Sequence, residues 1–252
     1  MHMDVIDLRD FYGRPLGAVA RTLITRRIGE IWPDVRGLNV AGLGFATPYL
    51  SPFQGQAQRV IGLMPAQQGV LAWPPNGKYL TCLVDETEIP LPDESMDRIL
   101  LVHGLEGSEA VRSMMRQIWR VLAPGGRLLV VAPNRRGLWS RREGTPFGIG
   151  QPFSRSQLTQ LMRENMFSPT RWETALYVPP VQWRPFLQSA GVWEQVGHTL
   201  WTRFSGVIMV EAGKQIYAAT PQPKRRLARR MRALSPAPVP QGMQAQHRQD
   251  ED

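Results

Sequence analysis

The sequence predicts an α/β fold in which a doubly wound, mostly parallel sheet of seven strands ends in a C-terminal antiparallel hairpin. Residues 120–135 carry the strongest signal, because a helix end, a Pro-Gly-Gly turn, an apolar strand and an exit loop follow one another there. Proline cannot continue a helix and glycine supplies the positive φ of a helix stop, so residues 124–126 end the helix. Residues 128–132 are apolar at every position, which is typical of a strand covered on both faces of a parallel sheet.

The other strand and helix signals alternate along the chain. An apolar stripe of helical spacing predicts helical structure between Asp7 and Ile31, and a second helix runs from Val111 to Leu122. Crossover helices between the early strands make their connections right-handed. The remaining predicted strands are short apolar runs, of which the last two form the hairpin: residues 38–41, 59–63, 79–84, 98–102, 193–201 and 206–211.

Composition divides the chain into three regions. Residues 1–36 form an N-terminal helical cap, residues 37–220 the α/β domain, and residues 221–252 a basic tail rich in Pro, Gln and Arg that we expect to be disordered. An insertion at about residues 137–185 is rich in aromatic residues and proline, with a short helix that begins after Ser154 and ends near residue 162. Because an open α/β sheet binds ligands outside its strand ends, this insertion is either an acceptor-binding lid or a cap that fills one end of the core.

The net charge of +9 is concentrated toward the end of the chain. Residues 221–252 contain seven basic and three acidic residues, and so carry a charge of +4. The segment 224–234 could form a short basic helix on RNA or on an acidic membrane surface, and the simpler alternative is a solvated tail.

The chain lacks the sequence signals of membrane insertion and secretion. No run approaches the roughly 20 apolar residues of a transmembrane segment, and the N-terminus has no basic region followed by an apolar run. The single cysteine, Cys82, excludes an intramolecular disulfide, and no His, Cys or Asp cluster has metal-ligand spacing. We therefore expect a cytoplasmic protein without a bound metal.

The run from Arg120 to Gly126, R-V-L-A-P-G-G, resembles the motif before the fifth strand of class I S-adenosylmethionine-dependent methyltransferases, particularly the type 11 group, which usually has lysine in place of Ala123. The resemblance extends from about Gly37 to about Lys214. It implies the Rossmann-like methyltransferase fold, S-adenosylmethionine as cofactor and methyl transfer to an acceptor that no motif identifies. Since the cofactor brings an activated methyl group, positioning for an in-line displacement can suffice without a catalytic base.

The resemblance places the methionine part of the cofactor at Gly42, Gly44 and Ala46, directly after the first predicted strand. Glycine lets the backbone approach the cofactor, and a following helix N-terminus offers N–H donors to its carboxylate. The alternative is a plain strand-to-helix turn. We expect Gly44→Asp to abolish cofactor binding while the fold survives.

Two positions that are usually acidic in the family differ in this chain. Val40 stands two residues before the first glycine, and Met64 stands at about the end of the second strand, where a carboxylate normally accepts hydrogen bonds from the ribose. The loss of a charged acceptor costs about 1.5–3 kcal/mol per hydrogen bond. Gln67 or Gln68 could replace it from the start of the following helix, without the charge.

The segment 84–97 is similar to the family's stretch after the third strand. The similarity implies that Asp85 accepts a hydrogen bond from the adenine amino group, with Glu86 beside it. The alternative for Asp85 is a turn cap. We expect Asp97 to fix the turn that enters the fourth strand.

His103 and Tyr12 are the remaining candidates near the transferred methyl group. His103 follows the fourth strand and is a weak candidate for a general base, beside a structural or adenosyl-packing role. Tyr12 could close over the cofactor.

The predicted acceptor-binding residues follow the fifth strand. Asn134 and Arg135, with Arg136, leave that strand toward the crevice, and an arginine pair suits a carboxylate or phosphate acceptor. Trp139 and Phe147 are the candidates from the insertion. The alternative for the arginines is a solvated loop.

Two other function classes remain beside the methyltransferase. Val40 and Met64 favour a catalytically degenerate relative whose crevice is a binding or scaffolding surface. The basic tail favours a factor associated with RNA or membrane.

Overall fold

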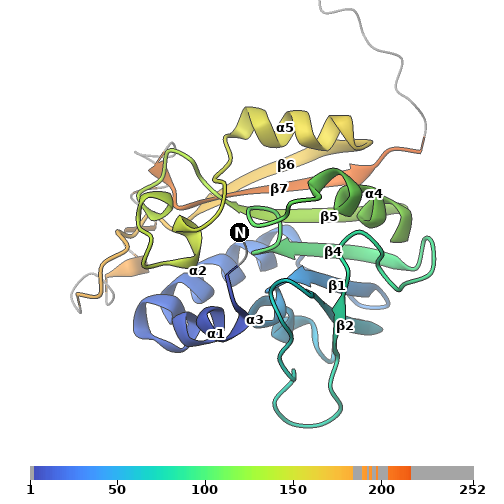
Figure 1. Cartoon of the computed structure of the whole chain (residues 1–252), viewed down its shortest axis with the longest axis horizontal. Coiled ribbons are helices and arrows are strands. Elements are labelled where there is room, and N and C mark those ends of the chain that lie inside the picture. Colours follow the sequence, from blue (N-terminus) through green and yellow to red (C-terminus); the bar gives the residue numbers. More distant parts are fainter. Residues whose placement is uncertain (1–2, 184–188, 192, 195–196, 198–203, 217–252) are drawn as a thin grey trace, which may run out of the picture. The chain divides into compact units, whose positions relative to one another are not determined.

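A computed structural model describes residues 3–183, 189–191, 193–194, 197 and 204–216, and it contains one seven-stranded sheet (Figure 1). The strand order is β3-β2-β1-β4-β5-β7-β6, and β7 runs in the direction opposite to the other six strands. The predicted α/β class and its doubly wound, mostly parallel sheet are confirmed. The strands are β1 (Asn39–Gly44), β2 (Arg59–Pro65), β3 (Thr81–Val84), β4 (Met96–Val102), β5 (Leu122–Pro133), β6 (Phe167–Ala175) and β7 (Val207–Lys214).

Helices cover both faces of the sheet. Figure 1 shows α1 (Val5–Gly13) and α2 (Pro15–Ile31) on one side of the sheet, with α4 (Val111–Val121) and α5 (Arg155–Glu164) on the other. Side chains alternate between these layers, as the strand period requires. Along β4, Leu100 and Val102 pack with the N-terminal helices, whereas Ile99 and Leu101 pack with α4 and α5.

The helix ends follow the sequence signals. The predicted N-terminal helical segment is two helices, because Arg14 adopts an extended conformation and Pro15 begins α2 at a position that proline favours. The predicted helix at Ser154 is confirmed: the Ser154 hydroxyl accepts a hydrogen bond from the Gln157 N–H, and the Gln157 side chain accepts one from the Ser154 N–H.

The antiparallel partner of β7 differs from the prediction. Strand β7 pairs with β6, which lies inside the region predicted as an insertion. The strand predicted at residues 193–201 is wrong where it can be compared, because residues 193, 194 and 197 are helical, while residues 198–203 lie outside the described part. The basic tail, 221–252, also lies outside it.

The connection between β2 and β3 differs as well. Residues 66–80 are all described, and they cross between the two strands without a helix, so Gln67 and Gln68 lie in a turn. Pro74, Pro75 and Gly77 explain this, since they oppose helix formation in the middle of the segment. A short helix, α3 (Thr47–Leu50), and a 3₁₀ turn, η1 (Ser51–Phe53), connect β1 to β2.

Candidate functional site

The glycine turn at the end of β1 is packed against protein. Gly44 is the last residue of β1 and has a φ of +80°, and a Cβ there would lie 2.2 Å from the Val102 carbonyl oxygen. A Cβ on Gly42 would lie 2.6 Å from the Ala46 Cβ. These glycines therefore let β1 approach α3 and the end of β4. Any side chain at position 44 would meet the β4 backbone, so we expect Gly44→Asp to destabilise the fold as well as to disturb the predicted cofactor site.

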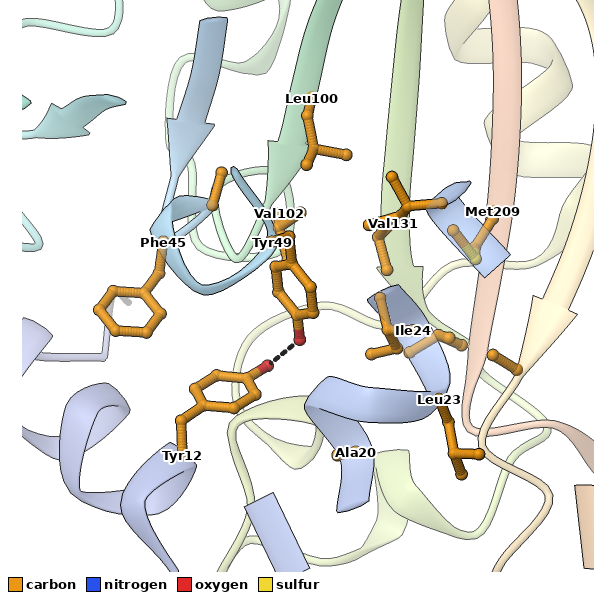
Figure 2. Close-up of a cluster of buried hydrophobic side chains, with 14 of the residues drawn as sticks. Tyr12, Ala20, Leu23, Ile24, Phe45, Tyr49, Leu100, Val102, Val131 and Met209 are labelled. Atoms are coloured by element: carbon orange, nitrogen blue, oxygen red, sulfur yellow. Dashed lines mark hydrogen bonds between the residues drawn. The ribbon is translucent and has the colours of Figure 1, made fainter. Parts of the chain in front are cut away.

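A chain of buried hydrogen bonds crosses the crevice above the ends of β1 and β4. The Tyr49 hydroxyl donates to the Tyr12 hydroxyl oxygen at 2.7 Å, and the Tyr12 oxygen lies 2.6 Å from His103 Nε2. His103 Nδ1 lies 2.9 Å from Glu106 Oε1. Figure 2 shows Tyr12 and Tyr49 pointing toward each other from α1 and α3. Because Tyr49 donates to Tyr12, the Tyr12 proton is free to bond His103 Nε2, and Nδ1–H then donates to the Glu106 carboxylate.

Gln68 closes the crevice from the β2 side. Its side-chain Nε2 donates to the His103 backbone carbonyl oxygen at 2.8 Å, and the Gln68 backbone carbonyl oxygen accepts the Val5 N–H at 2.8 Å. Since β1 lies between β2 and β4, the turn after β2 must pass over the end of β1 to make the first of these bonds. We call Tyr12, Tyr49, Gln68, His103 and Glu106 the polar cluster.

Two oxygen atoms of the polar cluster are buried without a hydrogen-bond partner. They are Gln68 Oε1 and Glu106 Oε2. Glu106 was missed from the sequence, where its one signal is a carboxylate three residues after His103 at the end of an apolar run. Its position gives the crevice a carboxylate that the end of β2 lacks.

Burial raises the pKa of both phenols in the polar cluster. Desolvation is the main cause for Tyr12 and for Tyr49, and the pKa of each lies above its usual value. Because the folded-state pKa exceeds the unfolded one, we expect the free energy of unfolding to be unaffected by these groups below pH about 10 and to fall as the pH rises above it. Urea unfolding between pH 8 and 11 measures how steeply the free energy of unfolding falls with pH. The slope should become shallower in Tyr49→Phe, and an unchanged slope would contradict the assignment.

S-adenosylmethionine, the cofactor that the resemblance implies, finds suitable acceptors here but no space. Glu106 Oε2 and Gln68 Oε1 could accept hydrogen bonds from its hydroxyl or amino groups. The cavity beside them has a volume of about 10 Å³, which is room for about one water molecule. The side chains that line this cavity would therefore have to rearrange before the cofactor could enter.

The other predicted cofactor positions make contacts within the protein. Asp85 is exposed, and its Oδ1 accepts the Thr87 N–H and hydroxyl, which lower the pKa of the Asp85 carboxyl. Glu86 is buried, and its Oε1 accepts the Ser108 hydroxyl at 2.6 Å. The Met64 sulfur is buried and accepts the Leu71 N–H at 3.3 Å. In the structure, His103 and Tyr12 therefore lie together at the crevice, whereas Asp85 lies in a separate turn.

The predicted acceptor-binding residues separate into buried and exposed groups. Trp139 and Phe147 are buried, with ring centroids 5.4 Å apart, and Trp139 Nε1 donates to the Val178 carbonyl oxygen. Asn134 is buried, and its amide donates to the Ser205 carbonyl oxygen. Arg135 and Arg136 are exposed where β5 ends.

Within the described part of the chain, the structure offers neither a metal site nor a membrane span. No group of three or more His, Cys, Asp or Glu residues among these residues could hold a metal ion. No helix formed by them is long and apolar enough to cross a bilayer.

Together, the strand order and the glycine turn define a protein of the Rossmann-like methyltransferase fold. Residues 38–130 match the family model described as a methyltransferase domain. This part of the chain is therefore similar to a methyltransferase domain, and S-adenosylmethionine is the cofactor that the similarity implies. No protein with a curated description matches the sequence.

Solved structures share this fold at low sequence identity. An S-adenosylmethionine-dependent methyltransferase of Thermotoga maritima is 16% identical over 84% of this chain and 95% of its own, with a TM-score of 0.57. A complex between the Trm112 methyltransferase activator of Haloferax volcanii and a methyltransferase matches at 15% identity, over 84% of this chain and 98% of its own, with a TM-score of 0.62. The [4+2]-cyclase SpnF matches at 17% identity, over 77% of this chain and 80% of its own, with a TM-score of 0.52. At these identities the comparison establishes the fold, which hosts more than one activity.

Proposed function

We propose that the protein binds S-adenosylmethionine and transfers its methyl group to an acceptor, and that its own side chains close the crevice between turnovers. The observation that supports this most directly is the pair of unpartnered acceptors, Glu106 Oε2 and Gln68 Oε1, beside the glycine turn of a methyltransferase domain. Buried polar atoms without a partner are rare in folded proteins. The donor groups of the cofactor would satisfy them, and Glu106 would replace the acid that is absent at Met64.

This proposal predicts a large effect of Glu106 on cofactor affinity. Glu106→Gln should weaken S-adenosylmethionine binding about 10- to 100-fold, because hydrogen bonds to a charged acceptor contribute about 1.5–3 kcal/mol. Calorimetric titration of the purified full-length chain with S-adenosylmethionine and S-adenosylhomocysteine measures the affinity. Glu109→Gln is the matched control, since Glu109 is exposed three residues away. If Glu106→Gln and the unaltered protein bind S-adenosylmethionine with equal affinity, Glu106 is not part of the cofactor site.

The acceptor would enter at the end of β5. Arg135 and Arg136 are exposed there and suit an anionic acceptor. The buried positions of Trp139 and Phe147 indicate that these two side chains would shape the wall of the site from within the core. A role for the tail at 224–234 in contacting RNA or an acidic membrane remains a prediction.

A non-catalytic binding or scaffolding protein is the second candidate, and the filled crevice favours it. Tyr12 and His103 satisfy each other, and the cavity beside them is too small for a cofactor. The same titration separates the two candidates. Micromolar affinity supports the methyltransferase, whereas no heat and no thermal shift at millimolar S-adenosylmethionine supports the non-catalytic protein.

A further inference from the structure

We infer that the protein has a second ligand site, and that this site takes a small molecule in which a phosphate group is joined to a flat ring. The site is a groove of about 990 Å³ that is lined by residues of α1, α2, α3 and η1 and by residues 71–73. Its volume is typical of small-molecule sites. Of the polar cluster, it shares Tyr12 and no other residue. We call it the basic groove.

Helix α2 forms the basic wall of this groove. Arg21, Thr22, Thr25 and Arg26 line it, and their spacing places them on one face of the helix. The opposite face packs on the sheet, and Figure 2 shows Ala20, Leu23 and Ile24 in that packing. The charged face of α2 is therefore turned away from the core and into the groove.

The charge of the groove selects an anion. Three arginines line it, and none of the described residues in its lining is acidic. Arg9 and Arg26 each have a carboxylate partner outside the lining, Asp10 and Glu30, in exposed ion pairs of the kind that contribute little to stability and exchange readily.

Arg21 is the arginine best placed to bind a ligand. In the described part of the chain it makes no ion pair, although it lies close enough to Tyr12 to influence the pKa of that phenol. A guanidinium matches the oxygens of a phosphate in pairs. The hydroxyls of Thr25 and Ser51, which also line the groove, are further donors.

The facing wall of the groove is apolar and is held in place. Leu71 and Trp73 line it, the Leu71 carbonyl accepts the Thr81 hydroxyl, and the Trp73 carbonyl accepts the Leu80 N–H, each at 2.7 Å. The Phe45 ring, which also lines the groove, stacks on the Tyr12 ring, with centroids 5.7 Å apart. Since Phe45 and Tyr12 are buried against each other, the partly exposed Trp73 ring is the aromatic surface that favours a flat ring as the apolar part of the ligand.

Calorimetric titration of the full-length protein with UDP, pyrophosphate and uridine tests this inference. UDP contains both a diphosphate and a flat pyrimidine ring. Because it has no adenine, its binding distinguishes the basic groove from a site that recognises adenine. We expect UDP to bind at least about ten-fold more tightly than either fragment, and Arg21→Gln to weaken UDP binding about 10- to 100-fold. The matched control is Arg116→Gln, since Arg116 is an exposed residue of α4, on the other face of the sheet.

Three outcomes would overturn the inference. They are no UDP binding at millimolar ligand, pyrophosphate binding as tight as UDP, and equal weakening by Arg21→Gln and Arg116→Gln, which would mean a diffuse charge effect. Thermal unfolding of both variants checks that they fold. The result is independent of the proposed methyl transfer, because Glu106→Gln alters the polar cluster and no residue of the basic groove.

Discussion

Gly44→Ala is expected to lower the free energy of unfolding by about 2–5 kcal/mol. A side chain at a positive φ costs about 1–2 kcal/mol, and the new Cβ would lie 2.2 Å from the Val102 carbonyl oxygen, so β1 and β4 must also shift apart. Overpacking of this kind costs about 1–3 kcal/mol more. Urea unfolding followed by circular dichroism measures the loss.

Gly55→Ala is the matched control for this substitution. Gly55 has a φ of +79°, close to that of Gly44, but an added Cβ there would have nothing within 4 Å. Gly55→Ala should therefore lower the free energy of unfolding only by the cost of a side chain at a positive φ, about 1–2 kcal/mol. If the two variants lose the same free energy, the close approach of β1 to β4 does not contribute, and the glycine turn regains the role of an open cofactor cradle.

Trp139→Ala is expected to lower the free energy of unfolding by about 3–5 kcal/mol, the usual cost of truncating a buried tryptophan. The Trp139 side chain is fully buried, lies edge-on to the Phe147 ring, and donates from Nε1 to the Val178 carbonyl oxygen at 2.8 Å. The substitution leaves a cavity and an unpaired carbonyl. Thermal and urea unfolding of the purified variant measure the loss.

Leu138→Ala provides the comparison for Trp139→Ala. Leu138 is the preceding residue and is 49% exposed, so its truncation should change stability by less than about 0.5 kcal/mol. Trp139 was predicted from its place in the insertion as an acceptor contact. If Trp139→Ala keeps the stability of the unaltered protein, the ring is available to a ligand and that prediction gains support.

The parallel half of the sheet could be predicted because its strands are nearly continuous apolar runs between turn residues. Strand β5 from Leu128 onward and strand β4 from Ile99 onward are buried on both faces, and such strands leave a signal that does not depend on the rest of the fold. The helix after Ser154 could be predicted equally well, because its capping box is formed by residues that are close together in the sequence.

Strand β6 could not be predicted for the opposite reason. It is half-buried along most of its length, and it contains Pro169 at a position where the pairing with β7 shifts register. An edge strand tolerates proline and needs few apolar residues, so its sequence resembles a loop. The run at 193–201 is richer in tryptophan, but those of its residues that the structure describes are helical.

The polar cluster depends on contacts that local sequence patterns do not encode. Tyr12 bonds both Tyr49 and His103 because three separate elements converge there. Gln68 reaches the same histidine because residues 66–80 form no helix. The resemblance could indicate His103 and Tyr12 as residues near the crevice. It could not indicate that they bond each other, nor that Glu106 would bring a carboxylate.

The position of β7 between β5 and β6 has a consequence for biosynthesis. Strand β7 comes last among the strands of the described residues but occupies an interior place in the sheet, so neither β5 nor β6 can complete its pairing until residue 214 has left the ribosome. Until then the nascent chain exposes two unpaired strand edges, which are templates for association with other chains. Folding should therefore complete late in synthesis, and nascent chains that stop before β7 should depend on chaperones to stay unaggregated.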